Sequence, residues 1–513
     1  MNIRFAFLCI PLVAGFAAGA QRIVYSNPDR EDTRRMNFEV IGKVGGNFLV
    51  YKNLRNNNHI SVYNTDMEQV AREPQSYLPD ERLVNVDFFP YPDFVYVVYQ
   101  YQRKNVVYCD AVRINSQGKV MGQPQTLDTS HIGFSTSSRI YSAFTNEAKT
   151  DVMVVKVNAR NRERFVVTSL LFNDSLQLRN RSVMPVVMDE RNDYLDEFGM
   201  DNDGDLTFIK FRRNNNESIS RVALLYKPAN ADSLLFNDLG LKDVYLDEVH
   251  VKIDNANKRY LLTSYAYKQR RGNIDALYFY AWDKMGRNVA MENIIPLSEE
   301  LKREARGDAS SRNAFNDHFI RNVVVTKDGG FLVSSEAYYT TSRFNNWNRW
   351  NYMGMGWGGW GMMGPMDFYN WGPGFYSPWA WRFNRFNNNG AVRHHADNVA
   401  LLSVDGSGKL QWSSVIHKEQ FDDESDDRIS YQILNTGGQL HFLFNQDERR
   451  ASRVLNDYVL VPDGTINRNP TLKNLDRNYE FMPRYAKQVG SRQLIVPCYY
   501  RNYIAFAKID YNS

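Results

Sequence analysis

Apolar and polar residues alternate in short runs along most of the chain, a pattern typical of half-buried β-strands. The clearest example is residues 322–418, which contain four such runs: 322–326, 331–335, 398–404 and 409–415. Glycine-containing turns at 327–330 and 405–408 separate the paired runs, and glycine supplies the positive φ that tight hairpin turns need. Four consecutive antiparallel strands form one meander, which is the unit of a propeller blade. This stretch therefore predicts one four-stranded blade.

The same strand–turn–strand signal recurs along the whole chain. Its turns lie near positions 45, 92, 150, 203, 256, 329, 437 and 490, a spacing of roughly fifty residues that is typical of repeat folds such as propellers. The last unit ends after its third strand, and we expect the apolar run at 22–25 to supply the fourth strand and close the ring. The sequence predicts an all-β fold: an eight-bladed β-propeller over residues 21–513, with seven blades as the next choice.

One pair of hairpins resembles a known family. Residues 325–333 read V-T-K-D-G-G-F-L-V and residues 404–412 read V-D-G-S-G-K-L-Q-W. They resemble the "DGG" propeller repeats of exported proteins from Bacteroidetes-type bacteria. Other units match in part, at Gly45-Gly46, Asp203-Gly204 and Gly437-Gly438, while the second, third and eighth units depart from the pattern. The resemblance implies an exported propeller and, because functions within the family vary, no catalytic residue.

The first twenty residues predict a signal peptide. A short basic segment at 2–4 precedes an apolar run at 5–16, and Ala18-Gly19-Ala20 resembles an A-x-A cleavage site. The apolar run is too short to span a bilayer comfortably. We therefore expect export, to the periplasm or to the outer membrane or cell surface, with the mature chain starting at Gln21.

The net charge and the cysteine content limit the kinds of partner and cross-link that we expect. The formal charge of +4 over 513 residues is small and its basic residues are scattered, so no nucleic-acid partner is expected. Only Cys109 and Cys498 remain after cleavage. In an exported protein they form either one disulfide or two buried thiols, and the sequence leaves both open.

A glycine-rich insert interrupts the sixth unit at residues 344–386. Glycine at this density excludes a stable helix or long strand. Three interpretations compete: a loop that covers the propeller's own face, a surface for a protein or glycan partner, and a segment in contact with a membrane or an outer-membrane barrel. As a surface, it would bind through its tryptophans, which are Trp347, Trp350, Trp357, Trp360, Trp371, Trp379 and Trp381.

Acidic residues come just before several predicted first strands. On a propeller they would converge on one mouth of the central channel, as a carboxylate ring for a cation or polar ligand, or as turn residues that satisfy local N–H groups. Residues 201–205, D-N-D-G-D, resemble part of a calcium loop but lack its closing Glu. No cofactor is predicted, and Ca²⁺ is the one ion these acids would suit. The channel-mouth acids are Asp80, Glu81, Asp196, Glu197, Asp247, Glu248, Asp317 and Asp427.

Catalytic motifs are absent from the sequence. Its eight histidines show no HExxH spacing, and no GxSxG, P-loop or Rossmann fingerprint occurs. The sequence therefore predicts a non-enzymatic binding or scaffold propeller that contacts a protein partner in the cell envelope through the aromatic insert. The alternative is a carbohydrate-active propeller that binds or cleaves a polysaccharide at the channel mouth.

Overall fold

The chain folds almost entirely into β-strands. The computed structural model describes residues 21–29, 36–54, 57–79, 82–132, 140–159, 164–190, 192–213, 218–270, 272–306, 313–342, 392–423, 426–448, 452–469, 479–501 and 503–511. Within these stretches one α-helix occurs, α1 (Glu299–Ala305), together with the short 3₁₀ helix η4 (Pro483–Tyr485). The predicted signal peptide and the insert at 344–386 both lie outside the described residues.

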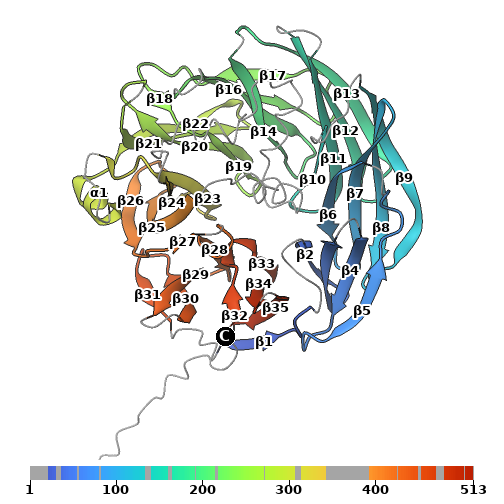
Figure 1. Ribbon diagram of the computed structural model, residues 1–513. Coiled ribbons are helices and arrows are strands. Elements are labelled where there is room, and N and C mark those ends of the chain that lie inside the picture. The colour runs from blue at the N-terminus through green and yellow to red at the C-terminus, as the bar shows by residue number, and fades with distance from the viewer. Residues whose placement is uncertain are drawn as a thin grey trace, which may run out of the picture.

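The first three sheets each contain four antiparallel strands in sequence order, with the first strand innermost and the fourth outermost (Figure 1). They are β2 (Met36–Val44), β3 (Asn47–Leu54), β4 (Asn57–Tyr63) and β5 (Gln69–Pro74); β6 (Leu83–Pro90), β7 (Phe94–Arg103), β8 (Val106–Asn115) and β9 (Val120–His131); and β10 (Tyr141–Thr145), β11 (Asp151–Ala159), β12 (Arg164–Asn173) and β13 (Leu178–Val187).

The next sheet has nine strands and contains two consecutive meanders. The short strand β18 (Tyr245–Leu246) pairs with β16 on one side and β20 on the other, and so joins the two. The first meander is β14 (Asp193–Met200), β15 (Leu206–Arg213), β16 (Ile219–Lys227) and β17 (Leu235–Asp238). The second is β19 (His250–Asp254), β20 (Arg259–Tyr267), β21 (Ile274–Asp283) and β22 (Asn288–Pro296).

Three further sheets complete the described part of the chain. They are β23 (His318–Val325), β24 (Phe331–Ser342), β25 (Val392–Val404) and β26 (Leu410–Ile416), with β27 (Phe421–Asp422) at one end; β28 (Tyr431–Asn435), β29 (Leu440–Glu448), β30 (Ser452–Leu460) and β31 (Ile466–Arg468); and β32 (Tyr479–Phe481), β33 (Lys487–Gly490), β34 (Gln493–Tyr500) and β35 (Tyr503–Asp510), with β1 (Arg22–Tyr25).

A recurring turn explains why the third and fourth strands pair in the same way in several sheets. Asn64, Asn115, Asn173 and Asp405 each accept hydrogen bonds from the backbone N–H groups two and four residues later. The residue three positions later is left-handed in each case, at Met67, Gly118, Leu176 and Gly408. The side-chain oxygen thus fixes the turn even where no glycine marks it.

Hydrophobic side chains fill the space between consecutive sheets. Eight such clusters occur among the described residues, and each joins neighbouring meanders. One of them joins the last sheet to the first, where the rings of Phe506 and Phe38 meet edge to face with centroids 5.7 Å apart. The sheets accordingly follow one another around a ring (Figure 1).

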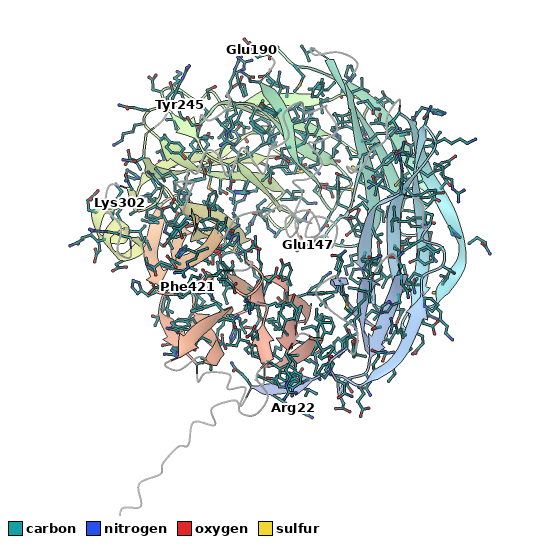
Figure 2. The ribbon with its side chains drawn as sticks, viewed as in Figure 1. Arg22, Glu147, Glu190, Tyr245, Lys302 and Phe421 are labelled. Carbon is teal, nitrogen blue, oxygen red and sulfur yellow. The ribbon has the colours of Figure 1, made fainter. Side chains whose placement is uncertain are left out.

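The N-terminal strand is the outermost strand of the last sheet. β1 pairs antiparallel with β35, with Arg22 opposite Asp510 and Tyr25 opposite Ala507. The ring of Tyr25 stacks on Tyr479 at 4.5 Å, and the Gln21 amide donates to Asp457 of β30 at 2.5 Å. Residues 22–25 thus form a strand of the last sheet. Figure 2 shows Arg22 at the outer edge of the ring and Glu147 toward its centre.

The structure also answers the question about the two cysteines and contains one helix that the sequence pattern does not predict. Cys109 in β8 and Cys498 in β34 are buried and form no disulfide, and burial raises the pKa of the Cys498 thiol. Helix α1 was not predicted. It begins after Ser298, whose hydroxyl accepts from the Leu301 N–H at 3.1 Å, and two glutamates follow in its first turn. That combination is a recognisable helix start.

Candidate functional site

The predicted channel-mouth acids and the insert belong to the same end of the sheets. In the sheet of β23, His318 pairs with Ala337 and Val325 with Phe331. The start of β23 and the far end of β24 therefore lie together, and the insert leaves β24 at that end. In a meander of four antiparallel strands the fourth strand ends where the first began, so the innermost strand of the next meander starts at this same end.

The structure places the predicted acids in two kinds of position. Asp247 and Glu248 precede β19, Asp317 directly precedes β23, and Asp427 lies shortly before β28. Asp196 and Glu197 lie inside β14, because that strand already begins at Asp193. Asp80 and Glu81 lie outside the described residues.

Some of these acids bind local donors. The Asp247 carboxylate is buried and accepts from the Tyr267 hydroxyl at 2.6 Å. The buried Asp427 accepts from the Tyr485 hydroxyl of the following sheet at 3.1 Å. The backbone carbonyl of Asp317 accepts from the Tyr338 N–H at 2.8 Å. The carboxylate contacts of Asp247 and Asp427 are of the kind expected when an acid stabilises the chain path, whereas the Asp317 contact involves only its main chain.

Asp196, Glu197 and Glu248 instead come together with His250, which sequence reasoning did not single out. We call these four residues the β14–β19 cluster. A β-bulge makes it possible: Asp196 pairs with Ile209 and Gly199 with Thr207, so two residues oppose only one on β15. Glu197 has a positive φ of 57° at this bulge, a conformation that costs free energy in a non-glycine residue.

The bulge separates two neighbouring side chains. Phe198 stacks on Phe208 with ring centroids 4.8 Å apart, while Glu197 reaches β19 and accepts from the Val251 N–H at 2.7 Å. Gly199 permits the close approach of the two strands, since a Cβ there would lie 3.0 Å from Cδ1 of Ile253. A larger residue at 199 would therefore require the Ile253 side chain to move.

Short distances link the members of the β14–β19 cluster. His250 Nδ1 lies 3.8 Å from Glu197 Oε1, and His250 Nε2 lies 3.6 Å from Glu248 Oε2. The Glu197 N–H donates to Asp196 Oδ1 at 2.8 Å. His250 and Glu248 are two residues apart, a spacing that could have drawn attention to the pair, since alternate residues of an extended chain share a side.

The pKa is raised at three members of the cluster, Asp196, Glu197 and His250. Burial, together with the nearby Glu197 and Glu248 carboxylates, raises the pKa of Asp196 well above its usual range. Burial also raises the pKa of Glu197, against the opposing effect of His250. Burial alone would lower the pKa of His250, but Glu248 and Glu197 outweigh it and raise that pKa. The cluster therefore retains protons, and could donate hydrogen bonds or exchange protons with a ligand.

Replacing Asp196 with Asn is expected to flatten the dependence of stability on pH. A raised pKa means that the folded state holds a proton that the unfolded state releases first. The stability gained from this proton is fully present below the pKa that Asp196 has in the unfolded chain. It is lost as the pH rises through the pKa that Asp196 has in the folded protein. Asn has no proton to lose and keeps the oxygen that accepts from Glu197. We expect Asp196→Asn to be more stable than wild type at pH 8, by roughly 1 kcal/mol or more, and to lose this advantage near pH 4.

Thermal unfolding of both proteins across this pH range measures the difference. The control is Asp66→Asn, at an exposed turn position, which should follow the wild-type profile. Parallel profiles for Asp196→Asn and wild type would contradict a retained proton at Asp196.

The strands that flank the insert form a ribbon at this end of the ring. β24 and β25 continue for five residue pairs beyond the last partner of β23, from Tyr338–Ala396 to Ser342–Val392. β27 pairs with this extension at His394 and His395. We call residues 338–342 and 392–396 the insert ribbon. The alternating pattern alone predicts that the second strand ends at 335 and the third begins at 398, because polar residues interrupt the alternation between them; both strands are longer in the structure.

Aromatic and charged contacts fix the insert ribbon. The ring of His395 stacks on Tyr339 with centroids 4.4 Å apart. The guanidinium of Arg393 lies 4.5 Å from the ring centroid of Phe421 and pairs with Asp423 at 2.6 Å. The insert ribbon is therefore held in place by specific side-chain contacts, and the insert connects its two strands. All seven insert tryptophans lie outside the described residues.

Two kinds of site receive no support from the described part of the chain. No group of three or more His, Cys, Asp or Glu side chains is arranged there to hold a metal ion. Among the same residues, no helix combines the length and apolar character needed to cross a membrane.

Comparisons with known proteins give only distant similarities. No model of a known protein family matches the chain, and no curated protein matches it. Among solved structures, the polysaccharide lyase Uly1 is 8% identical with a TM-score of 0.37, over 84% of this chain and 90% of that one. Prolyl oligopeptidase B from Galerina marginata is 9% identical with a TM-score of 0.38, over 94% of this chain and 56% of that one. Similarities this weak carry no functional argument.

Proposed function

We propose that this chain is an exported, non-enzymatic binding propeller that contacts a protein partner of the cell envelope through its aromatic insert. The proposal includes eight blades closed by β1. Eight inter-sheet hydrophobic clusters, one of which joins the last sheet to the first, support this count. The pairing of β1 with β35 supports the closure.

The insert ribbon is the observation that carries the proposal. A long loop does not require paired strands at its ends. Here, however, β24 and β25 stay paired for five residue pairs beyond the last partner of β23, up to the start of the insert. β27 and the contacts of Arg393 and His395 brace that extension. Such a support suits a segment that is presented to a partner, and Trp and Met are residues enriched at protein interfaces.

The location of the partner follows from the sequence. The N-terminal segment reads as a signal peptide, and the hairpins at 325–333 and 404–412 resemble repeats of exported bacterial propellers. We therefore propose that the protein resides in the periplasm, at the outer membrane or on the cell surface. Tryptophan also suits the boundary between membrane and water, so an outer-membrane protein is the partner that we favour.

Replacing residues 344–386 with a short Gly-Ser linker is expected to abolish partner binding without unfolding the propeller. The measurement is an affinity pull-down from native envelope extract with the intact protein and with the linker variant. We expect a specific envelope protein to be recovered only with the intact form, because the linker removes the tryptophans and leaves the sheets in place.

The matched control keeps the insert and changes the exposed surface elsewhere, as in Arg221→Met. This control should recover the same partner as the intact protein. Equal thermal unfolding of all three proteins would show that the linker variant is folded. Recovery of the same proteins with and without the insert would contradict the proposal.

The second candidate is a carbohydrate-active propeller, and the β14–β19 cluster is the observation that favours it. Carboxyl groups that retain protons beside an imidazole could bind sugar hydroxyls or act as acid and base. Turnover of a polysaccharide that is lost in Glu197→Gln would favour this candidate over the scaffold.

A further inference from the structure

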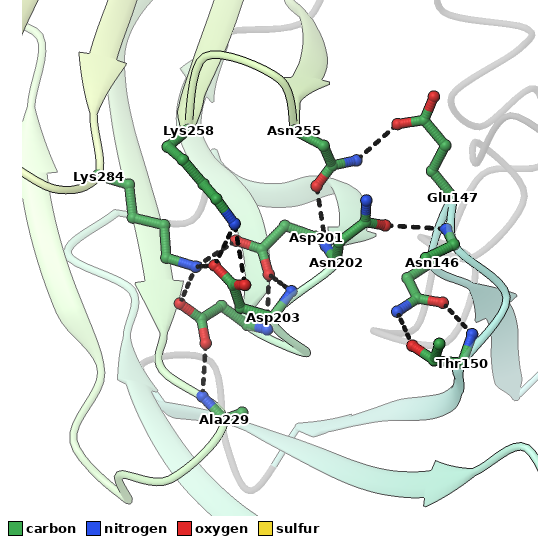
Figure 3. Close-up of polar contacts among 12 residues, drawn as sticks. Asn146, Glu147, Thr150, Asp201, Asn202, Asp203, Ala229, Asn255, Lys258 and Lys284 are labelled. Atoms are coloured by element: carbon green, nitrogen blue, oxygen red, sulfur yellow. Dashed lines mark hydrogen bonds and ion pairs between the residues drawn. The ribbon is translucent and has the colours of Figure 1, made fainter.

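The loop between β14 and β15 carries three aspartates that point to one position. Asp201, Asp203 and Asp205 alternate in this turn, and the sequence resembles part of a calcium loop. Asp201 and Asp205 are buried at 4% and 6% exposure. Figure 3 shows the carboxylates of Asp201 and Asp203 at the tip of a lysine side chain from the next meander.

That lysine is Lys284, in the turn between β21 and β22. Its Nζ lies 2.6 Å from Asp201 Oδ2, 2.7 Å from Asp203 Oδ2 and 2.7 Å from Asp205 Oδ2. An ammonium group has three donors and no acceptor, so three carboxylate oxygens satisfy it fully. The Lys284 N–H also donates to the Lys258 carbonyl at 3.0 Å, which fixes the start of the side chain.

The remaining oxygens of the loop also have partners. Asp201 Oδ1 accepts from the N–H groups of Asp203 and Asp205 at 2.9 and 3.0 Å. Asp205 Oδ1 accepts from the Ala229 N–H at 2.7 Å, and Asp203 Oδ1 pairs with Lys258 Nζ at 2.9 Å. The loop is thus held with its three inner oxygens pointing at one cation position (Figure 3).

We propose that this loop is a cation site whose cation is supplied by the protein itself, the ammonium of Lys284. The lysine takes the place that a divalent metal ion would hold in an aspartate-rich loop. Because Lys284 belongs to the following meander, the same contact joins two neighbouring units of the ring.

Charge supports this assignment. Three carboxylates close together repel one another strongly unless a cation neutralises them. Burial alone would lower the pKa of Lys284, but its bonds to Asp201, Asp203 and Asp205 raise that pKa instead. Bonds to Lys284 and Lys258 lower the pKa of Asp203. Lys284 and Asp203 are therefore charged at neutral pH, and the ammonium supplies the positive charge of the junction.

Replacing Lys284 with Met is expected to turn the loop into a Ca²⁺ site. Met removes the charge while keeping an apolar chain of similar length, so three carboxylate oxygens lose their cation. In EDTA we expect the melting temperature of Lys284→Met to fall by several degrees. Calcium at about 1 mM, within the affinity range of extracellular calcium modules, should restore most of the loss. The measurements are thermal unfolding and calorimetric titration with CaCl₂.

Two controls define the outcome. The wild-type melting temperature should be the same in EDTA and in calcium, a result that requires no variant to fold. Lys258→Met removes the second partner of Asp203 but leaves Lys284 in place, so it should gain no calcium response. A wild type that EDTA destabilises, or a Lys284→Met protein that calcium does not stabilise, would overturn the proposal.

A double variant covers the case in which Lys284→Met alone does not fold. Asp203→Asn with Lys284→Met removes one carboxylate together with the ammonium, which leaves less unneutralised charge. We expect it to fold in EDTA and to bind calcium several-fold more weakly than Lys284→Met, or to show no calcium response. Tight calcium binding by the double variant would exclude Asp203 as a ligand and contradict the assignment.

Discussion

Removal of residues 21–26 is expected to lower the free energy of unfolding by roughly 5 kcal/mol. About four backbone hydrogen bonds at about 1 kcal/mol each, together with the burial of Ile23 and Tyr25 against the last sheet, account for this estimate. β35 would then become an unpaired edge strand, and such edges promote association between chains. The measurements are chemical denaturation and size-exclusion chromatography of the shortened protein.

A peptide in trans provides the control for this deletion. A synthetic peptide with the sequence of residues 21–27 should pair with β35 and restore part of the lost stability, as in strand addition to an open sheet edge. A scrambled peptide of the same composition should not. Unchanged stability after the deletion would show that the pairing of β1 with β35 contributes little to the stability of the last sheet.

Replacing Lys418 with Met is expected to cost about 3–5 kcal/mol, the range for removing one partner of a buried ion pair. Lys418 and Glu336 are both fully buried, with Nζ 2.8 Å from Glu336 Oε1. The ammonium also donates to the Ala396 carbonyl at 2.5 Å and to Gln420 Oε1 at 2.8 Å. Its loss leaves the buried Glu336 carboxylate with the Ser430 hydroxyl, which donates to it at 2.6 Å, and with the Arg321 guanidinium 3.5 Å away. Chemical denaturation measures the change.

The double variant Lys418→Met/Glu336→Gln should recover part of this loss, because no uncompensated charge remains. Arg221→Met is the matched control. Its pair with Asp238 is exposed on both sides, and exposed pairs contribute about 0–1 kcal/mol. If Lys418→Met cost no more than Arg221→Met, the buried pair would not stabilise the sheet of β23–β26.

Much of the strand order could be predicted because the alternating pattern indicates the strands and the turn residues indicate where they end. Gly45-Gly46 and Asp328-Gly329-Gly330 mark hairpins that the structure contains, and the apolar run at 22–25 is a strand. Turns at Met67 and Leu176 are harder to recognise, since their left-handed residues are not glycine. There the structure depends on the side-chain oxygens of Asn64 and Asn173.

The candidate site was harder to predict from the sequence than the strands were. The acids at 196, 197 and 248 stood out, but their association with His250 depends on a β-bulge and on two strands from different meanders. The role of Lys284 was equally hidden, because it lies about eighty positions from the aspartates that it contacts. Alternation along one strand contains no information about which turn of the next unit will face it.

The pairing of the first strand with the last also constrains how the chain folds. Residues 22–25 leave the ribosome early but find their partner only when β35 has been made. This contact spans nearly the whole chain, and contacts between distant segments form slowly because their loop-closure entropy must be overcome first. Until then both edges stay open to other chains or to chaperones. For an exported protein, the final folding step would therefore come after translocation is complete.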